Sequence, residues 1–239
     1  MFAARAGAWL RKGLCMDAGP IISATAVVKT YRTREVVVDA LKHVDFEVMP
    51  GEMVAVMGPS GSGKTTLLNC MSGLDSIDSG DVSIAGQLLR TMSDDALSDY
   101  RATSMGFVFQ AYNLLPVLSA QENVELPLML AGTSSKEAQA RAVEKLELVG
   151  LGDRTDHLPA ELSGGQQQRV AIGVALANHP PLLLADEPTG ELDDATAGEI
   201  LDLFGTVNQE LNTTILIVTH DPDIAYKVGR VVMILDGKM

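Results

Sequence analysis

A glycine-rich loop, set between an apolar run and a helical pattern, constrains the fold of this 239-residue chain more than any other feature. Residues 58–65 read GPSGSGKT, which fits the pattern G-x-x-x-x-G-K-[ST]. Glycines allow consecutive backbone N–H groups to face phosphate oxygens, and the start of a helix adds positive charge. We therefore expect a phosphate cradle in which Lys64 contacts the β- and γ-phosphates and the hydroxyl of Thr65 binds Mg²⁺.

Strand and helix patterns alternate along the chain. Alternating or continuous apolar residues predict strands at residues 24–31, 36–41, 44–48, 53–57, 106–110, 182–185 and 214–218. Helical spacing predicts helices at residues 65–72, 135–149 and 163–178. This order is typical of an α/β fold with a mostly parallel sheet and flanking helices. We expect the first strands to form an antiparallel side sheet, and a helical subdomain to be inserted at about residues 111–178.

Composition and charge exclude several classes of protein. The formal net charge of −13 and the aromatic content of 4% both argue against a nucleic-acid-binding protein. Two cysteines, Cys15 and Cys70, are too few for a disulfide framework, which is typical of a reducing compartment. No apolar run is long enough to predict a membrane span. Residues 1–22 are expected to form a flexible arm, with residues 23–239 as the folded domain.

Polar residues at three further strand ends indicate the rest of the site. Asp186 and Glu187 follow an apolar run, so we expect Asp186 to hold a hydrated Mg²⁺ and Glu187 to orient or deprotonate a water. His220 and Gln110 follow two other strands and should reach the same sheet edge. His220 is expected to contact the γ-phosphate, and Gln110 to bridge Mg²⁺ and the water. Taken alone, a histidine or a glutamine at a strand end is more typical of a structural role.

A second glycine motif, LSGGQ at residues 162–166, begins a predicted helix. Ser163 is a suitable N-cap, and Gly164 and Gly165 leave backbone N–H groups open to an anion. The helical insertion separates this motif from the phosphate loop, which already has its ligands. The motif is therefore expected to serve the nucleotide of a second copy, in a head-to-tail dimer with a nucleotide at both joints.

The order and spacing of these motifs over about residues 24–238 resemble the ATP-binding subunits of ABC transporters. The resemblance implies a P-loop NTPase of the ABC-ATPase type with a RecA-like core, and ATP and Mg²⁺ as its ligands. It also adds Tyr31, as the aromatic that stacks on adenine, and Asp193, as the D-loop aspartate. The implied catalytic residues are Glu187, His220 and Gln110, and the implied metal ligands are Thr65, Gln110 and Asp186. The implied nucleotide-binding residues are Tyr31, Gly58, Pro59, Ser60, Gly61, Ser62, Gly63, Lys64, Thr65, Thr66, Ser163, Gly164, Gly165, Gln166 and Asp193.

Residues 31–48, 106–128 and 186–193 are most similar to the subgroup that serves lipoprotein release, macrolide export and cell division. The resemblance implies an ATPase that closes as a homodimer on ATP, drives an integral membrane permease and lies at the cytoplasmic face of the membrane. The alternative is the ATPase of a non-transporting complex that transmits mechanical force to cell-envelope processes. ATPases of DNA repair or translation and P-loop kinases fit less well, because of the acidic charge and the LSGGQ motif respectively.

One departure from the family's usual sequence concerns charge. The D-loop reads GELDD where GNLDS is common, so that Glu191 and Asp194 add negative charge near the expected dimer joint. We expect this charge to increase the repulsion between protomers before nucleotide binds.

Overall fold

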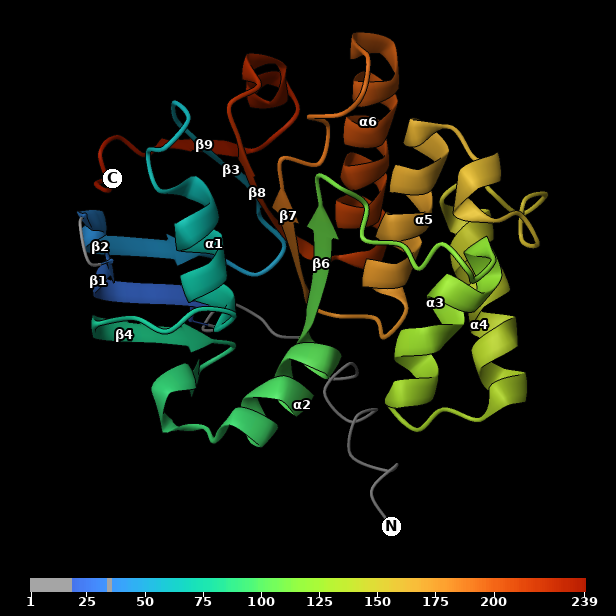
Figure 1. The fold of residues 1–239 in the computed structure, drawn as a ribbon, viewed down its shortest axis with the longest axis horizontal. Helices are drawn as coiled ribbons and strands as arrows, with labels where there is room; N and C mark the ends of the chain where they lie inside the picture. The colour runs from blue at the N-terminus through green and yellow to red at the C-terminus, as the bar shows by residue number, and fades with distance from the viewer. Residues whose placement is uncertain (1–18, 34–35) are drawn as a thin grey trace.

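The computed structural model describes residues 19–33 and 36–239, which form two sheets flanked by helices (Figure 1). A five-stranded parallel sheet has the order β6-β7-β8-β3-β9, and a four-stranded antiparallel sheet has the order β2-β1-β4-β5. The strands are β1 Ile22–Arg32, β2 Val37–Val48, β3 Met53–Met57, β4 Ser79–Ile84, β5 Gln87–Leu88, β6 Met105–Phe109, β7 Leu182–Asp186, β8 Thr214–Thr219 and β9 Arg230–Met233. The predicted α/β class and the antiparallel side sheet are confirmed.

Six α-helices accompany the sheets in the part of the chain that the structure describes. They are α1 Lys64–Ser72, α2 Asp94–Ser104, α3 Ala120–Leu130, α4 Ser135–Leu148, α5 Gly164–Leu176 and α6 Asp194–Leu211. Short 3₁₀ helices lie at Leu89–Thr91, Pro159–Glu161 and Pro222–Tyr226. Of the described helices, none combines the length and the apolar character that a membrane crossing requires.

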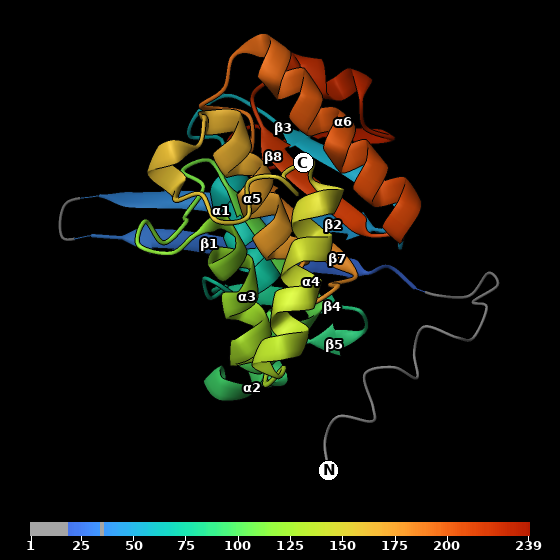
Figure 2. The same cartoon turned by 90° about the vertical axis from the view of Figure 1, so that its right-hand side faces the viewer.

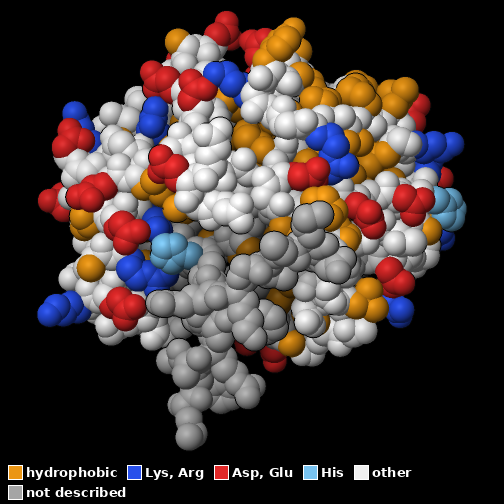
Figure 3. Space-filling view, turned by 180° about the vertical axis from the view of Figure 1, so that it is seen from behind, with side chains coloured by type: hydrophobic (Ala, Val, Ile, Leu, Met, Phe, Trp, Pro, Cys, Tyr) orange, Lys and Arg blue, Asp and Glu red, His pale blue; other side chains and the backbone are white. Residues whose placement is uncertain are grey.

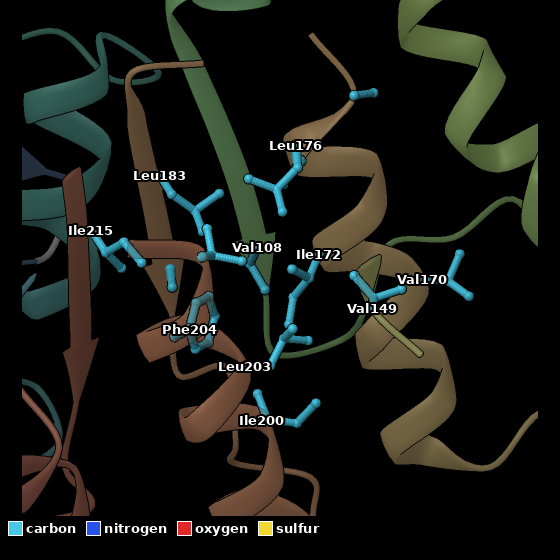
Figure 4. Packing of buried hydrophobic residues seen from close by; sticks show 14 of the residues in the cluster. Val108, Val149, Val170, Ile172, Leu176, Leu183, Ile200, Leu203, Phe204 and Ile215 are labelled. Carbon is cyan, nitrogen blue, oxygen red and sulfur yellow. The ribbon is translucent and has the colours of Figure 1, made fainter. Parts of the chain in front are cut away.

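The central strands β3, β7 and β8 of the parallel sheet are buried on both faces, because their residues alternate between two hydrophobic clusters. Val54 and Val56 of β3 face the cluster that includes α1 and the side sheet, whereas Ala55 faces the cluster that includes α5 and α6. Figure 4 shows the second cluster, in which Ile172 of α5 and Phe204 of α6 pack toward the strands. Continuous apolar runs therefore form these strands, since neither face meets water.

Helices α3, α4 and α5 lie together on one side of the parallel sheet, next to α6 (Figures 1 and 2). All three fall within the segment in which the sequence predicts helices. Serine side chains cap their N-termini: Ser119 accepts from the backbone of Glu122, Ser134 from Glu137, and Ser163 from Gln166. Residues 1–18 of the predicted arm are outside the described residues. β1 begins at Ile22, one residue before the expected boundary.

The predicted strands at residues 36–41 and 44–48 are in fact one strand, β2. His43 lies between them with φ 54°, and the pairing of β2 with β1 shifts register in this region. A bulge with one residue in the left-handed region interrupts the alternation of side chains without ending the strand. β4, β5, β9, α2, α3 and α6 were not among the predicted elements.

Candidate functional site

Four parallel strands end at one edge of the sheet and bring the predicted site residues together. The register aligns Phe109 with Asp186, Asp186 with Val218, and Met57 with Thr219. The residues that follow these ends are Gln110, Glu187, Gly58 and His220. The sequence-based expectation of a shared edge is therefore confirmed by the register.

The phosphate loop joins β3 to α1, and close contacts require glycine at two of its positions, Gly58 and Gly63. A Cβ on Gly58 would lie 2.2 Å from the carbonyl oxygen of Ile234, and one on Gly63 would lie 2.6 Å from that of Ala40. Gly63 also has φ 105°, a backbone angle that residues with a side chain rarely adopt. The residues after β9 hold the loop in turn, since Gly237 donates its N–H to Ser62 at 3.0 Å. We call residues 234–238 the C-terminal clasp.

Lys64 lies inside the loop that the sequence assigns to phosphates. Its Nζ donates to the carbonyl oxygens of Gly58 at 2.8 Å and Pro59 at 3.2 Å, and it lies 3.7 Å from Glu187 Oε1. The side chain is only 7% exposed. The ammonium group is thus fixed in position beside the carboxylate that the sequence predicts to be catalytic.

Thr65 and Asp186 form a pair that fits the requirements of Mg²⁺. The hydroxyl of Thr65 donates to Asp186 Oδ1 at 3.1 Å, which sets two oxygen ligands side by side. Burial raises the pKa of Asp186, and the charge of nearby Glu187 raises it further, against the opposing hydrogen bond from Thr65. Mg²⁺ prefers oxygen ligands and commonly uses one carboxylate together with water and substrate phosphates. A cation here would also offset the unfavourable burial of the charged carboxylate.

Glu187 is held by a network at the end of β8. Its Oε2 accepts hydrogen bonds from the Thr219 hydroxyl at 3.0 Å and the His220 backbone at 3.2 Å. The Nδ1 atom of His220 lies 3.0 Å from both carboxylate oxygens. Glu187 has φ 46°, a strained conformation for a residue with a side chain. The hydrogen bonds fix the carboxylate of Glu187 in this backbone conformation, and the Glu187 side chain is 15% exposed. Thr219 was not predicted, although it directly precedes His220.

Gln110 reaches the same sheet edge but binds a different partner. Its Nε2 donates to Glu191 Oε1 at 3.2 Å, so that its hydrogen bond goes to the segment after β7 rather than to Thr65 or Asp186. The structure thus brings Glu187, His220, Lys64, Thr65 and Asp186 together and sets Gln110 beside them. The role of Gln110 at a metal stays a prediction.

A cavity of about 650 Å³ opens beside the phosphate loop. Tyr31, Val37 and Val38 from the side sheet line it together with the loop residues Ser60, Gly61, Gly63, Lys64, Thr65 and Thr66, and with Glu187. Tyr31 is 40% exposed there. The predicted aromatic residue and the predicted phosphate loop therefore face one space large enough for a nucleotide.

The LSGGQ segment starts α5 and packs against the start of α6. A Cβ on Gly164 would lie 2.9 Å from the hydroxyl of Tyr112, and one on Gly165 would lie 2.3 Å from Cγ2 of Thr196. Asp193 caps α6 by accepting from the backbone of Thr196 at 3.1 Å and from its hydroxyl at 2.8 Å. Five of the predicted nucleotide-binding residues lie outside the lining of the cavity, as the described part of the chain forms it. They are Ser163, Gly164, Gly165, Gln166 and Asp193.

Comparison with known proteins gives the family. Residues 41–190 match the family described as ABC transporter. The chain belongs to this family. It is 51% identical to an uncharacterized ABC transporter ATP-binding protein of Thermotoga maritima, over 92% of this chain and 93% of that protein. The macrolide export ATP-binding/permease protein MacB of Syntrophobacter fumaroxidans is 48% identical over 91% of this chain but only 31% of its own length.

The solved structures of ABC transporter cassettes agree with this assignment. The dimeric structure of MJ0796, a bacterial ABC transporter cassette, superimposes with a TM-score of 0.84 at 44% identity, over 91% of this chain and 96% of that one. A second dimeric structure of MJ0796, in a post-hydrolysis state with ADP and Pi, superimposes equally well at 43% identity. The predicted ABC-type ATPase and its resemblance to macrolide exporters are thereby confirmed.

Proposed function

We propose that this ABC ATPase hydrolyses ATP between two copies of the chain and so drives a membrane permease at the cytoplasmic face of the membrane. The observation that carries the proposal is the position of Glu187, whose Oε1 lies 3.0 Å from Nδ1 of His220 and 3.7 Å from Nζ of Lys64. A fixed carboxylate beside a phosphate-binding lysine is suited to positioning water for attack on a terminal phosphate.

The base and the phosphates of ATP would bind in different parts of the cavity. The ring of Tyr31 would stack on the adenine, while the loop N–H groups and Lys64 would hold the β- and γ-phosphates. Thr65 and Asp186, with Gln110 as a further predicted ligand, would hold Mg²⁺, which neutralises phosphate charge when bound. Because Lys64 is already fixed in the loop, little ordering of its side chain is required on binding.

The chemical step needs a base and a means of orienting it. Glu187 would accept a proton from water as the water oxygen attacks the γ-phosphorus and the bond to the bridging oxygen breaks, which leaves ADP and phosphate. His220 and Thr219 would keep the carboxylate aimed at the water through the hydrogen bonds described above. Most of the catalysis would thus come from positioning.

The dimer would supply the remaining contacts to the γ-phosphate. The partner's Ser163, the partner's Gly164 and the partner's Gly165 would offer a hydroxyl and backbone N–H groups to the nucleotide of this chain. The position of this motif outside the cavity supports a contribution from a second copy, as does the similarity to a cassette solved as a dimer. Closure of two such joints on ATP would provide the mechanical movement.

The helical insertion would transmit this movement to the permease. Residues 113–124 are our proposed coupling segment, because they follow Gln110 and leave Leu115 and Val117 exposed. We propose likewise that residues 111–178 act as a subdomain of the ATPase domain at 23–239. The similarity to MacB supports a membrane partner. A non-transporting complex that acts on the cell envelope would use the same ATPase residues and is the second candidate.

A substitution of Glu187 tests both the chemistry and the dimer. In Glu187→Gln, ATP should still bind, hydrolysis should slow by at least about 10²-fold, and an ATP-dependent dimer should accumulate. Light scattering coupled to size-exclusion chromatography, with and without ATP, measures the dimer. Glu52→Gln, which alters a carboxylate paired with Arg230 away from the cavity, is the control. A persistent monomer with normal turnover would contradict the proposal.

A further inference from the structure

Tyr31 is tied to two charged residues that have no part in the mechanism above. Its hydroxyl donates to Asp75 Oδ2 at 2.7 Å, and Lys29 Nζ donates to the other carboxylate oxygen of Asp75 at 2.7 Å. Lys29 also donates to the carbonyl oxygen of Ser76 at 2.7 Å and lies 5.0 Å from the centroid of the Tyr31 ring. The three side chains therefore form one connected cluster, and Tyr31 is its member that lines the cavity.

The carboxylate of Asp75 is itself placed by the helix that starts in the phosphate loop. α1 ends at Ser72 and is capped by Gly73, which has φ 67°; the chain then turns back so that Asp75 donates its N–H to the carbonyl oxygen of Asn69 at 3.1 Å. The N-terminus of this helix carries Lys64 and Thr65. One short helix thus fixes both the phosphate-binding residues and the acceptor for the Tyr31 hydroxyl.

The cluster also covers one face of the Tyr31 ring and leaves the other face free. The Lys29 ammonium lies over the ring, and the Lys29 side chain is only 9% exposed, so one face is taken by a buried cation. Tyr31 itself is 40% exposed and lines the cavity. The ring is therefore held at its hydroxyl and on one face, while the remaining surface is available to a flat ligand.

We propose that Asp75 and Lys29 are positioning residues for the nucleotide base, and that they act by fixing the ring of Tyr31 at the mouth of the phosphate-loop cavity. The inference rests on the proposed function, since it requires a base at Tyr31. A ring that is already immobile loses no rotational freedom when the base stacks on it, and so the bound complex is favoured. Asp75 and Lys29 contribute to base affinity without touching the nucleotide.

The test compares a ligand that has a base with one that lacks it. ATP and inorganic tripolyphosphate share the phosphate chain, but only ATP has an adenine. Tyr31→Phe keeps the ring and leaves the Lys29–Asp75 ion pair intact while it removes the hydroxyl; Asp75→Asn keeps the side-chain volume and removes the charge. We expect either change to weaken ATP binding by about 3- to 10-fold and to leave tripolyphosphate binding unchanged.

Calorimetric titration of both ligands, together with the KM and kcat of ATP hydrolysis, measures the effect. KM for ATP should rise more than kcat falls, because the chemistry at Glu187 is not altered. Asp81→Asn is the matched control, since Asp81 belongs to the same side sheet and the change breaks its ion pair with Arg90. It should change neither ligand's affinity. Tyr31→Phe keeps the test decisive if Asp75→Asn does not fold.

Each result has a clear meaning. An equal loss of ATP and tripolyphosphate affinity would show that Asp75 supports the phosphate loop and not the base, and the inference would be overturned. Unchanged affinity for both ligands in Tyr31→Phe would also overturn it. If the unmodified chain bound neither ligand, the proposed function would fail first, and the inference would fail with it.

Discussion

Asp186 and Asp75 are both partly buried aspartates, but their surroundings shift their pKa values in opposite directions. Burial raises the pKa of Asp186, and the neighbouring Glu187 adds to the shift. Burial also acts to raise the pKa of Asp75, but the hydrogen bonds from Lys29 and Tyr31 outweigh it and lower the value. Asp75 is thus stabilised as an anion within the protein, whereas Asp186 is stabilised only if a cation joins it.

Asp186→Asn should stabilise the nucleotide-free and metal-free protein at neutral pH. Because the folded-state pKa of Asp186 is raised, its stabilising effect is present below the unfolded pKa and is lost as the pH rises through the folded value. At neutral pH the ionised carboxylate therefore opposes folding, and asparagine removes that effect. We expect a higher Tm by differential scanning fluorimetry with EDTA at pH 7, and a difference that shrinks toward pH 4. A constant difference across this range would contradict the assignment.

Lys64→Ala should weaken nucleotide binding by at least about 10-fold, because a charge-assisted contact to the phosphates is lost. The ammonium also binds the carbonyl oxygens of Gly58 and Pro59, so the loop loses internal support as well. Titration with a fluorescent ATP analogue measures the affinity. Lys227→Ala, which removes a lysine paired with Asp202, is the control. Unchanged affinity in Lys64→Ala would refute the role of the lysine.

Residues that carry a motif could be predicted, and residues that act only through tertiary contact could not. Lys64, Thr65, Asp186, Glu187 and His220 were all predicted, since each follows a strand or loop pattern of its own. In contrast, the role of Asp75 depends on the return of the chain after α1, and the position of the Tyr112 hydroxyl beside Gly164 depends on how the segment after β6 meets the start of α5. These partners are far apart in sequence, and local spacing gives no sign that they meet.

At the level of elements, α5 and α6 approach so closely that the glycines at the start of α5 have a packing role as well as a predicted binding role. Thr196 of α6 lies over Gly165, and its hydroxyl is bound to Asp193 at 2.8 Å. Threonine is stiff at χ1, and rotation would break this hydrogen bond. The methyl group of Thr196 therefore cannot rotate away from a side chain added at Gly165 without breaking this hydrogen bond.

Gly165→Ala should destabilise the protein by about 1–3 kcal/mol, because the new Cβ would lie 2.3 Å from the Thr196 methyl group. Thr196→Ser removes this methyl and keeps the hydroxyl, so the double variant should recover most of the loss. Urea unfolding of the two single variants and the double variant measures the coupling.

Gly198→Ala is the matched control for this cycle, since a Cβ at that position in α6 meets no atom within 4 Å. It should stabilise the protein by about 0.5–1 kcal/mol through helix propensity. Equal losses in Gly165→Ala with and without Thr196→Ser would show that the clash is not the cause.

Elements were predictable where burial imposes a clear pattern. β3 and β7 are continuous apolar runs, because both faces are covered. α2 has no fully buried residue, and only Leu97 and Tyr100 pack against the core, so its apolar stripe is short, although Ser93 caps it. α6 does carry such a stripe, at Ala197, Ile200, Leu201, Phe204 and Val207, and its helical spacing was available in the sequence. The break expected within β2 corresponds to a bulge at His43 that only the pairing with β1 defines.

At the scale of the whole molecule, the charge of −13 opposes dimer formation. Figure 3 shows acidic and basic side chains interspersed over one face, so this net charge does not appear there as a patch of one sign. Glu191 and Asp194, by contrast, are both exposed and lie close together where α6 begins, next to the LSGGQ glycines. Two copies that meet at this region would bring four such carboxylates together.

Salt should therefore strengthen the ATP-bound dimer of Glu187→Gln. Between about 0.01 M and 0.1 M salt the screening length falls from about 30 Å to about 10 Å, which weakens repulsion between like-charged protomers. We expect the dimer dissociation constant from analytical ultracentrifugation at saturating ATP to decrease over this range. Adding Glu191→Gln and Asp194→Asn should reduce the salt dependence. A dimer that weakens with salt would indicate that attraction between opposite charges dominates the joint.

The C-terminal clasp bears on how the protein is made. The phosphate loop leaves the ribosome early, but Ile234 and Gly237, which lie against it, emerge only after α6 and β8. Until then the nascent chain has the right loop sequence without the neighbours that shape it. We therefore expect nucleotide capture to follow the synthesis of residues 234–237, because the loop takes its shape only against them.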